Sequence, residues 1–338
     1  MCGLTLAGIG EWASGRFDSS HADGGHDASS VAAAGGRGNF AAAPVPDSLP
    51  DLPEARNYLP VDNPGYSFRR DVQEVQLQFT VADPQGRAVQ DLSPADVRIF
   101  DDQTPVEHFN DFERSQDLPL RLGLVLDTSD SVRRALADEK TAATKFLDRV
   151  MRSQADTAFV MGFGGDVRVW QDSTANREDL SAAIAHLKQP GWGTRFFDAL
   201  YSASSRLSAP AEKPLHRAVI VLTDGDDTDS IHRLTDVIAT AQRGDIQIYA
   251  LTIRDGKAAG RGDPILQRLT ETTGGRLYIA QSSHDLDAAF AQIERDLRTQ
   301  YYVSFRPQQP TPGFHALRVE VRPLQNLEVH ARRGYYAQ

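Results

Sequence analysis

Two hydrophobic patterns divide this chain into a central region and two flanks. Between residues 116 and 299, short runs of consecutive apolar residues alternate with longer segments in which apolar residues recur every three or four positions. Continuous apolar runs are typical of strands buried on both faces of a parallel sheet, and the longer periodicity is typical of amphipathic helices. The central region is therefore predicted to be an α/β layer with a mainly parallel sheet.

The expected strands of this layer cover residues 120–126, 157–163, 167–171, 218–222, 246–253 and 276–280. The expected helices cover residues 132–151, 180–189, 195–207, 231–244, 264–275 and 286–300. A short GGD connection separates the second strand from the third, which predicts a hairpin and an antiparallel edge to the sheet.

The flanks show the strict alternation of half-buried antiparallel strands. Val75, Leu77, Phe79 and Val81 share one face of the first such strand, and similar patterns recur in 71–115 and again in 300–338. Neither flank has enough strands to bury a sheet by itself. The economical prediction is one small antiparallel β-sandwich built from both flanks, with the central domain (116–299) inserted between its strands.

Residues 1–70 differ from the rest in composition. They are rich in Gly, Ala, Ser, Pro and Asp with little periodicity, which is typical of a disordered or extended tether. Cys2 lies at the start of this segment and is a candidate site for a lipid anchor, although no basic and apolar export signal precedes it. We expect an extracytoplasmic location if an export signal lies upstream of this chain, and a cytoplasmic location otherwise.

The strongest chemical signal follows the first strand of the central region. Asp127, Ser129 and Ser131 place one carboxylate and two hydroxyls within a single turn. Magnesium prefers near-octahedral oxygen ligands and is usually held by one or two carboxylates, with waters and an outside ligand in the remaining positions. This turn therefore predicts part of a site for a small divalent cation.

The motif resembles the metal-ion-dependent adhesion site of von Willebrand factor type A domains, which combines Asp-x-Ser-x-Ser with a distant Thr and a distant Asp. Thr194 and Asp224 match the two distant positions. The resemblance implies a doubly wound, Rossmann-like sheet of order 3-2-1-4-5-6, in which Asp127 and Asp224 end neighbouring strands at one crevice. It also implies that Mg2+ or Mn2+ is the bound metal.

Each of these residues also has a simpler interpretation when it is taken alone. Ser131 would cap the helix that follows it, Thr194 would cap the helix beginning at Arg195, Asp127 would start a helix, and Asp224 would form an Asp-Gly turn. The joint order of the three motif parts favours the metal site over these local roles.

The flanks extend the resemblance to the bacterial VWFA-related family. The matching segments are GRAVQDLSPADVRIFDD at 86–102, LTETTGGRLYIA at 269–280 and HARRGYYA at 330–337. The resemblance implies a non-enzymatic adhesion or assembly module whose metal accepts an Asp or Glu carboxylate from a partner protein. The alternatives are a structural or scaffolding envelope protein whose metal serves stability only, and a metal-dependent phosphate-ester hydrolase.

Composition and motifs argue against other functions. The net charge of -10 and the scattered Lys and Arg residues argue against a nucleic-acid surface. The nine histidines form no HExxH motif, no GxSxG elbow is present, and the single cysteine permits no internal disulfide. No segment approaches the length of a transmembrane helix. Of two Arg-Gly-Asp sequences, the one at 243–245 is interpreted as a helix end capped by Gly244.

Overall fold

A computed structural model describes residues 74–114, 118–152, 154–188, 192–211, 213–254, 260–309, 311–322 and 326–337, without the side chains of residues 131, 283 and 284. The predicted tether and Cys2 lie outside the described residues. Among the described residues, no helix has the length and apolar character required to cross a membrane.

The centre of the fold is a six-stranded sheet of order β10-β9-β8-β5-β6-β7. Numbered from the first strand of the domain, this order is 3-2-1-4-5-6, as predicted. All neighbours are parallel except β6 and β7, whose antiparallel pairing confirms the predicted hairpin edge. The strands are β5 (Leu120–Asp127), β6 (Thr157–Phe163), β7 (Val167–Thr174), β8 (His216–Leu222), β9 (Ile246–Ile253) and β10 (Leu277–Ala280).

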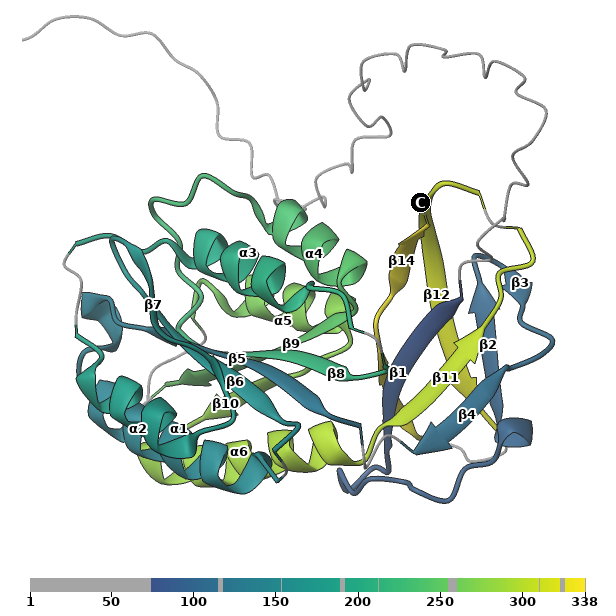
Figure 1. Cartoon of the computed structure of the whole chain (residues 1–338), viewed down its shortest axis with the longest axis horizontal. Helices are drawn as coiled ribbons and strands as arrows, with labels where there is room; N and C mark the ends of the chain where they lie inside the picture. Colours follow the sequence, from purple (N-terminus) through teal and green to yellow (C-terminus); the bar gives the residue numbers. More distant parts are fainter. Residues whose placement is uncertain are drawn as a thin grey trace, which may run out of the picture. The chain divides into compact units, whose positions relative to one another are not determined.

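Helices cover both faces of this sheet (Figure 1). On one face lie α1 (Leu136–Val150), α2 (Arg177–His186) and α6 (Ser283–Arg298), and on the other lie α3 (Phe196–Leu207), α4 (Leu234–Arg243) and α5 (Asp263–Thr273). β5 serves both layers because successive side chains of a strand point to opposite faces: Leu124 and Leu126 join the first core and Val125 joins the second. The continuous apolar runs of the sequence reflect this double burial.

Segments from both flanks form two four-stranded sheets that pack as a sandwich. One sheet has the order β13-β1-β11-β4 and the other β14-β12-β2-β3. The strands are β1 (Val75–Ala82), β2 (Val97–Asp101), β3 (Thr104–Pro105), β4 (Asp111–Arg114), β11 (Tyr301–Phe305), β12 (Gly313–Val321), β13 (Glu328–Ala331) and β14 (Gly334–Ala337). Strands from before and after the α/β domain pair directly, since Phe79 of β1 lies opposite Tyr301 of β11, with ring centroids 5.4 Å apart.

The polar face of β1 is buried as well, which the alternating pattern did not predict. Gln78 donates a hydrogen bond from Nε2 to the carbonyl oxygen of Leu215 in the α/β domain, at 3.3 Å. Arg332 donates from Nη1 to the carbonyl oxygen of Gln242 at 3.1 Å, and from Nη2 to the carbonyl oxygen of Gln76. The hydrogen bonds to Leu215 and Gln242 link the sandwich to the α/β domain, on the side of β1 that was expected to meet water.

Several element boundaries also differ from the predicted ones. Helix α1 begins at Leu136 because residues 130–132 form a separate 3-10 turn, so Ser131 does not cap this helix. Helix α4 ends at Arg243 with Gly244 as its C-cap, but this glycine has a φ of -87° and is not a left-handed cap. Its lack of a side chain serves close packing, because a Cβ atom there would lie 2.4 Å from Oγ of Ser208.

Candidate metal-binding site

The two acids of the predicted site lie at the carboxyl ends of neighbouring strands. Asp127 is the last residue of β5, and Asp224 follows the end of β8 by two residues. The two strands pair in parallel, with Leu126 opposite Leu222, so both acids reach the same edge of the sheet. Doubly wound sheets bind ligands where the winding reverses, and it reverses between these two strands.

Asp127 is fully buried and held by hydrogen bonds to both of its carboxylate oxygens. The backbone N–H of Ser129 donates to Oδ1 at 2.9 Å, and the hydroxyl of Thr223 donates to Oδ2 at 2.7 Å. Burial raises the pKa of Asp127 to about 6, although the hydrogen bonds from Ser129 and Thr223 oppose this shift and the charge of Asp224 adds to it. Without a cation, the site is therefore an unfavourable place for negative charge.

The turn after β5 is fixed against the neighbouring strand. The backbone N–H and the hydroxyl of Thr128 both donate to the carbonyl oxygen of Phe163, at 2.7 and 2.8 Å. Ser129 is buried and begins the 3-10 turn that contains Ser131. The side chain of Ser131 lies outside the described residues, so its predicted role as a ligand stays a prediction.

Thr194 lies on a loop that is held between two other loops of the same edge. Its backbone N–H donates to Oγ1 of Thr228, and its carbonyl oxygen accepts from the N–H of Thr228, both at 2.9 Å. The next residue, Arg195, donates its N–H to the carbonyl oxygen of Gly164 at 2.8 Å, just beyond β6. Thr194 thus lies between the loops that follow β6 and β8, with its side chain mostly buried.

Thr223 is a residue of this site that the sequence motif does not include. Its hydroxyl donates to Asp127 and accepts a hydrogen bond from the N–H of Gly225 at 3.1 Å. Gly225 has a φ of +80°, a backbone conformation that favours glycine, and this turn carries Asp224. The hydroxyl therefore connects the acid at the end of β5 to the turn that carries the acid after β8.

The loop after β8 also caps α3, the helix that follows Thr194. Oδ1 of Asp227 accepts a hydrogen bond from the N–H of Phe197 at 3.2 Å, and Oγ of Ser230 accepts from the N–H of Asp198 at 3.1 Å. The dense acid and hydroxyl sequence DGDDTDS is the signal in the sequence for such capping.

Glu139 is a third acid near the site, and sequence analysis missed it. It lies in α1, is 3% exposed, and its Oε2 accepts no hydrogen bond from the described residues. Burial, together with the charges of Asp127 and Asp224, raises the pKa of Glu139 to about 8. The signal was its position on the apolar stripe of α1, three residues after Leu136, where a charged residue is unexpected.

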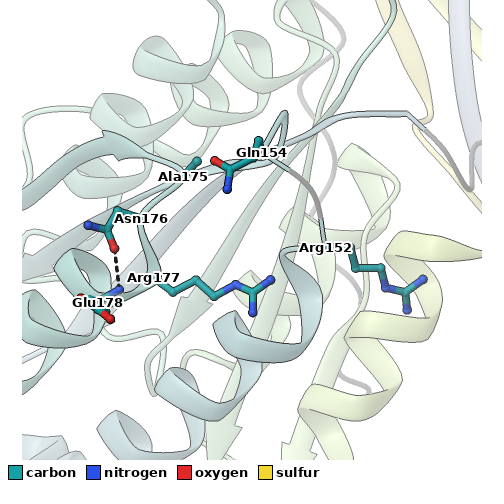
Figure 2. A pocket seen from close by; sticks show the side chains of 6 residues that line it. All are labelled: Arg152, Gln154, Ala175, Asn176, Arg177 and Glu178. Carbon is teal, nitrogen blue, oxygen red and sulfur yellow. Dashed lines mark hydrogen bonds between the residues drawn. The ribbon is translucent and has the colours of Figure 1, made fainter.

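A cleft of about 540 Å³ lies elsewhere on the α/β domain and contains none of the predicted site residues. Figure 2 shows its lining by Arg152, Gln154 and the start of α2, including Asn176, which caps that helix. Strand pairing places this cleft at the opposite edge of the sheet, because Thr174 at the end of β7 lies opposite Ala158 at the start of β6.

The donors at the Asp127 edge fit a hard divalent cation. The structure brings Asp127, Ser129 and Asp224 to one edge and anchors Thr194 between loops of that edge. These residues carry carboxylates and hydroxyls, which are the ligand types that Mg2+ and Mn2+ prefer. When bound, such an ion would offset the buried negative charge. It would also act as a Lewis acid toward an oxygen ligand from outside the protein.

Comparisons with known proteins agree with this fold. A family model described as von Willebrand factor type A domain matches residues 122–292, slightly more than half of the 338-residue chain. No curated protein sequence matches the chain.

Several solved structures are similar to this chain. BatB from Bacteroides thetaiotaomicron is 17% identical, with 53% of this chain and 100% of that chain covered and a TM-score of 0.44. A von Willebrand factor type A protein from Catenulispora acidiphila is 12% identical, with 80% and 75% covered and a TM-score of 0.45. Proximal thread matrix protein 1 from the mussel byssus, solved with a zinc-occupied MIDAS motif, is 14% identical, with 55% and 50% covered and a TM-score of 0.46.

Proposed function

We propose that this chain, which belongs to the von Willebrand factor type A domain family, binds a partner protein through a metal ion held at the Asp127 edge of its sheet. Asp127, Ser129, Ser131, Thr194 and Asp224 would surround Mg2+ or Mn2+. The partner would supply an Asp or Glu carboxylate to the remaining coordination position.

The placement of Asp127 is the observation that carries this proposal. A fully buried carboxylate with a second acid beside it is costly unless a cation compensates the charge. Hydrogen bonds from Ser129 and Thr223 keep this carboxylate oriented at the strand end in spite of that cost. Such orientation is typical of metal ligands, which are themselves held by hydrogen bonds from neighbouring residues.

The charge balance supports an acidic ligand from outside. Asp127 and Asp224 together carry the charge that neutralises one divalent ion. Glu139 adds little negative charge of its own in the metal-free protein near neutral pH, because its pKa there is raised to about 8. The metal therefore retains affinity for one more anionic oxygen ligand.

The open coordination position can be tested with a small carboxylate. Mn2+ bound to the full chain would be followed by water-proton relaxation while acetate is added, with acetamide as a neutral ligand of the same shape. We expect acetate to displace a bound water and acetamide to have little effect. Equal effects of the two compounds would argue against a site selective for carboxylates.

The remaining alternatives differ in what metal removal does. A protein-binding module loses its partner from an envelope extract when chelator is added or when Asp127 is replaced by alanine. A scaffold with a stability-only metal keeps every partner and shows only a lower melting temperature. Turnover of a generic phosphate ester that Asp127→Ala abolishes would favour a hydrolase.

A further inference from the structure

A second cluster of metal-ligating side chains lies in the β-sandwich, outside the α/β domain. Asp101 ends β2, Asp102 begins the turn toward β3, and His315 lies on β12, which pairs with β2. Nδ1 of His315 lies 3.5 Å from Oδ1 of Asp101 and 3.1 Å from Oδ2 of Asp102. One ligand atom from each residue falls within 4.8 Å of the other two.

The hydrogen bond at Nε2 of His315 determines where the ring carries its hydrogen. Nε2 lies 2.8 Å from the carbonyl oxygen of Thr311, and a carbonyl can only accept, so Nε2 carries a hydrogen. In the neutral ring, Nδ1 then carries no hydrogen, and its lone pair is directed at two carboxylates. Three acceptors that face one another require a positive charge between them, which is a proton on Nδ1, a proton on one of the carboxylates, or a metal ion.

Each residue of the cluster is also held from outside, as metal ligands usually are. Asp101 accepts a hydrogen bond at Oδ2 from the hydroxyl of Tyr335 at 3.0 Å, and Asp102 accepts at Oδ1 from the N–H of Ala316 at 2.9 Å. His315 is 4% exposed and stacks on the ring of Tyr335, with centroids 5.1 Å apart. These contacts leave one atom of each residue directed at a common point.

Asp101 supplies an independent sign that this cluster suits a cation. Its Oδ1 is buried and accepts no hydrogen bond from the described residues. A buried carboxylate oxygen without a hydrogen-bond donor is costly, and a metal ion or an ordered water is a usual remedy.

Two of the three separations between the ligand atoms suit a tetrahedral ion. Ligands about 2.0 to 2.1 Å from zinc stand about 3.3 Å from one another, which is close to the two separations at Nδ1. Beside the cluster lies a cavity of about 90 Å³, lined in part by Thr104, Gln308 and the three ligand residues. This cavity has room for a water molecule as a fourth ligand.

We propose that Asp101, Asp102 and His315 form a second metal site that binds Zn2+ or a similar transition-metal ion, separately from the site at Asp127. One imidazole nitrogen and two carboxylates suit zinc better than Mg2+, which prefers oxygen ligands alone. The ion would cross-link β2 and β12, neighbouring strands of one sheet that come before and after the α/β domain in the sequence, and so strengthen their pairing.

Zinc titration of the untagged full chain tests this proposal. Asp127→Asn would remove the first site from every sample, so that calorimetry and thermal melting report the second site only. We expect one Zn2+ per chain and a higher melting temperature with zinc. Adding His315→Gln should abolish binding, and adding Asp102→Asn should weaken it at least about tenfold, as loss of a metal-site residue usually does.

Glu113→Gln is the matched control, because Glu113 is an exposed acid of the same sandwich on β4. It should leave zinc binding unchanged. The proposal fails if Asp127→Asn binds no zinc, or if Asp102→Asn and Glu113→Gln bind it equally well. Since Asp102 is largely exposed, its variant keeps the test decisive even if His315→Gln does not fold.

Nitrogen NMR of His315 distinguishes a metal ion bound at Nδ1 from a proton bound there. Saturating zinc should leave Nε2 protonated and give Nδ1 the chemical shift of a metal-bound nitrogen. A ring that stays protonated at both nitrogens in saturating zinc would show that a proton supplies the positive charge, and would overturn the proposal.

Discussion

Glu139 should make the metal-free protein lose stability as the pH rises. Its raised pKa means that the folded protein keeps a proton on this carboxyl between about pH 4.5 and 8, whereas the unfolded chain has lost it. Folding stability therefore falls across this window, because the unfolded state binds fewer protons. Glu139→Gln removes the ionisable group while keeping the shape of the side chain.

The size of the effect follows from the shift in pKa. One unit corresponds to about 1.4 kcal/mol, so a shift from 4.5 to about 8 corresponds to about 5 kcal/mol, of which about 3 to 4 kcal/mol falls between pH 5 and pH 8. Relaxation of the surrounding structure lowers such figures, and we expect at least about 2 kcal/mol to remain.

Urea unfolding of the wild type and Glu139→Gln in chelator, at pH 5 and at pH 8, measures this directly. Asp127 also titrates here, with a pKa of about 6, but it is common to both proteins and its contribution cancels in the comparison. Asp138→Asn is the matched control, because Asp138 is an exposed acid adjacent to Glu139 in the same helical turn.

The variant should lose less stability than the wild type between the two pH values. Saturating Mg2+ should reduce the loss in the wild type, because a nearby cation favours the ionised carboxyl. Equal pH dependence in the wild type and Glu139→Gln would refute this reasoning, as would a variant that is less stable than the wild type at pH 8.

Three further substitutions probe the contacts of the site and the fold. Thr223→Val should raise the pKa of Asp127 and cost about 1.5 to 3 kcal/mol, since it removes a hydrogen bond to a carboxylate; an unchanged urea midpoint would contradict this. Arg332→Met should cost about 1 to 3 kcal/mol, because buried carbonyl groups lose their donor, and hydrogen exchange should rise in β1. Phe290→Ala should cost about 3 to 5 kcal/mol in thermal unfolding, because it empties the space beside Phe146, whose ring centroid lies 4.8 Å away; a loss below 1 kcal/mol would be incompatible with this packing.

The sequence predicted the sheet and the position of its acids well, because both depend on local patterns. Continuous apolar runs marked β5 and β8; Asp127 directly follows the first run, and Asp224 follows the second after Thr223. The order of the strands came from the family resemblance, and the structure confirms it.

Features that depend on contacts between distant segments could not be predicted. The alternation in β1 identified two faces, but it could not indicate that the α/β domain covers the polar one, where Gln78 is buried. His315 and Asp102 are far apart in the sequence, and only the pairing of β12 with β2 brings them together. Glu139 is different, because its position on the apolar stripe of α1 is a local signal of burial that the sequence analysis missed.

Binding of Mn2+ to the wild type and to Asp127→Asn, followed by electron paramagnetic resonance, tests the central claim most directly. We predict that the wild type holds one ion at the Asp127 edge and that Asp127→Asn loses this ion, while His315→Gln retains it. Equal Mn2+ binding by the wild type and a well-folded Asp127→Asn variant would contradict the claim.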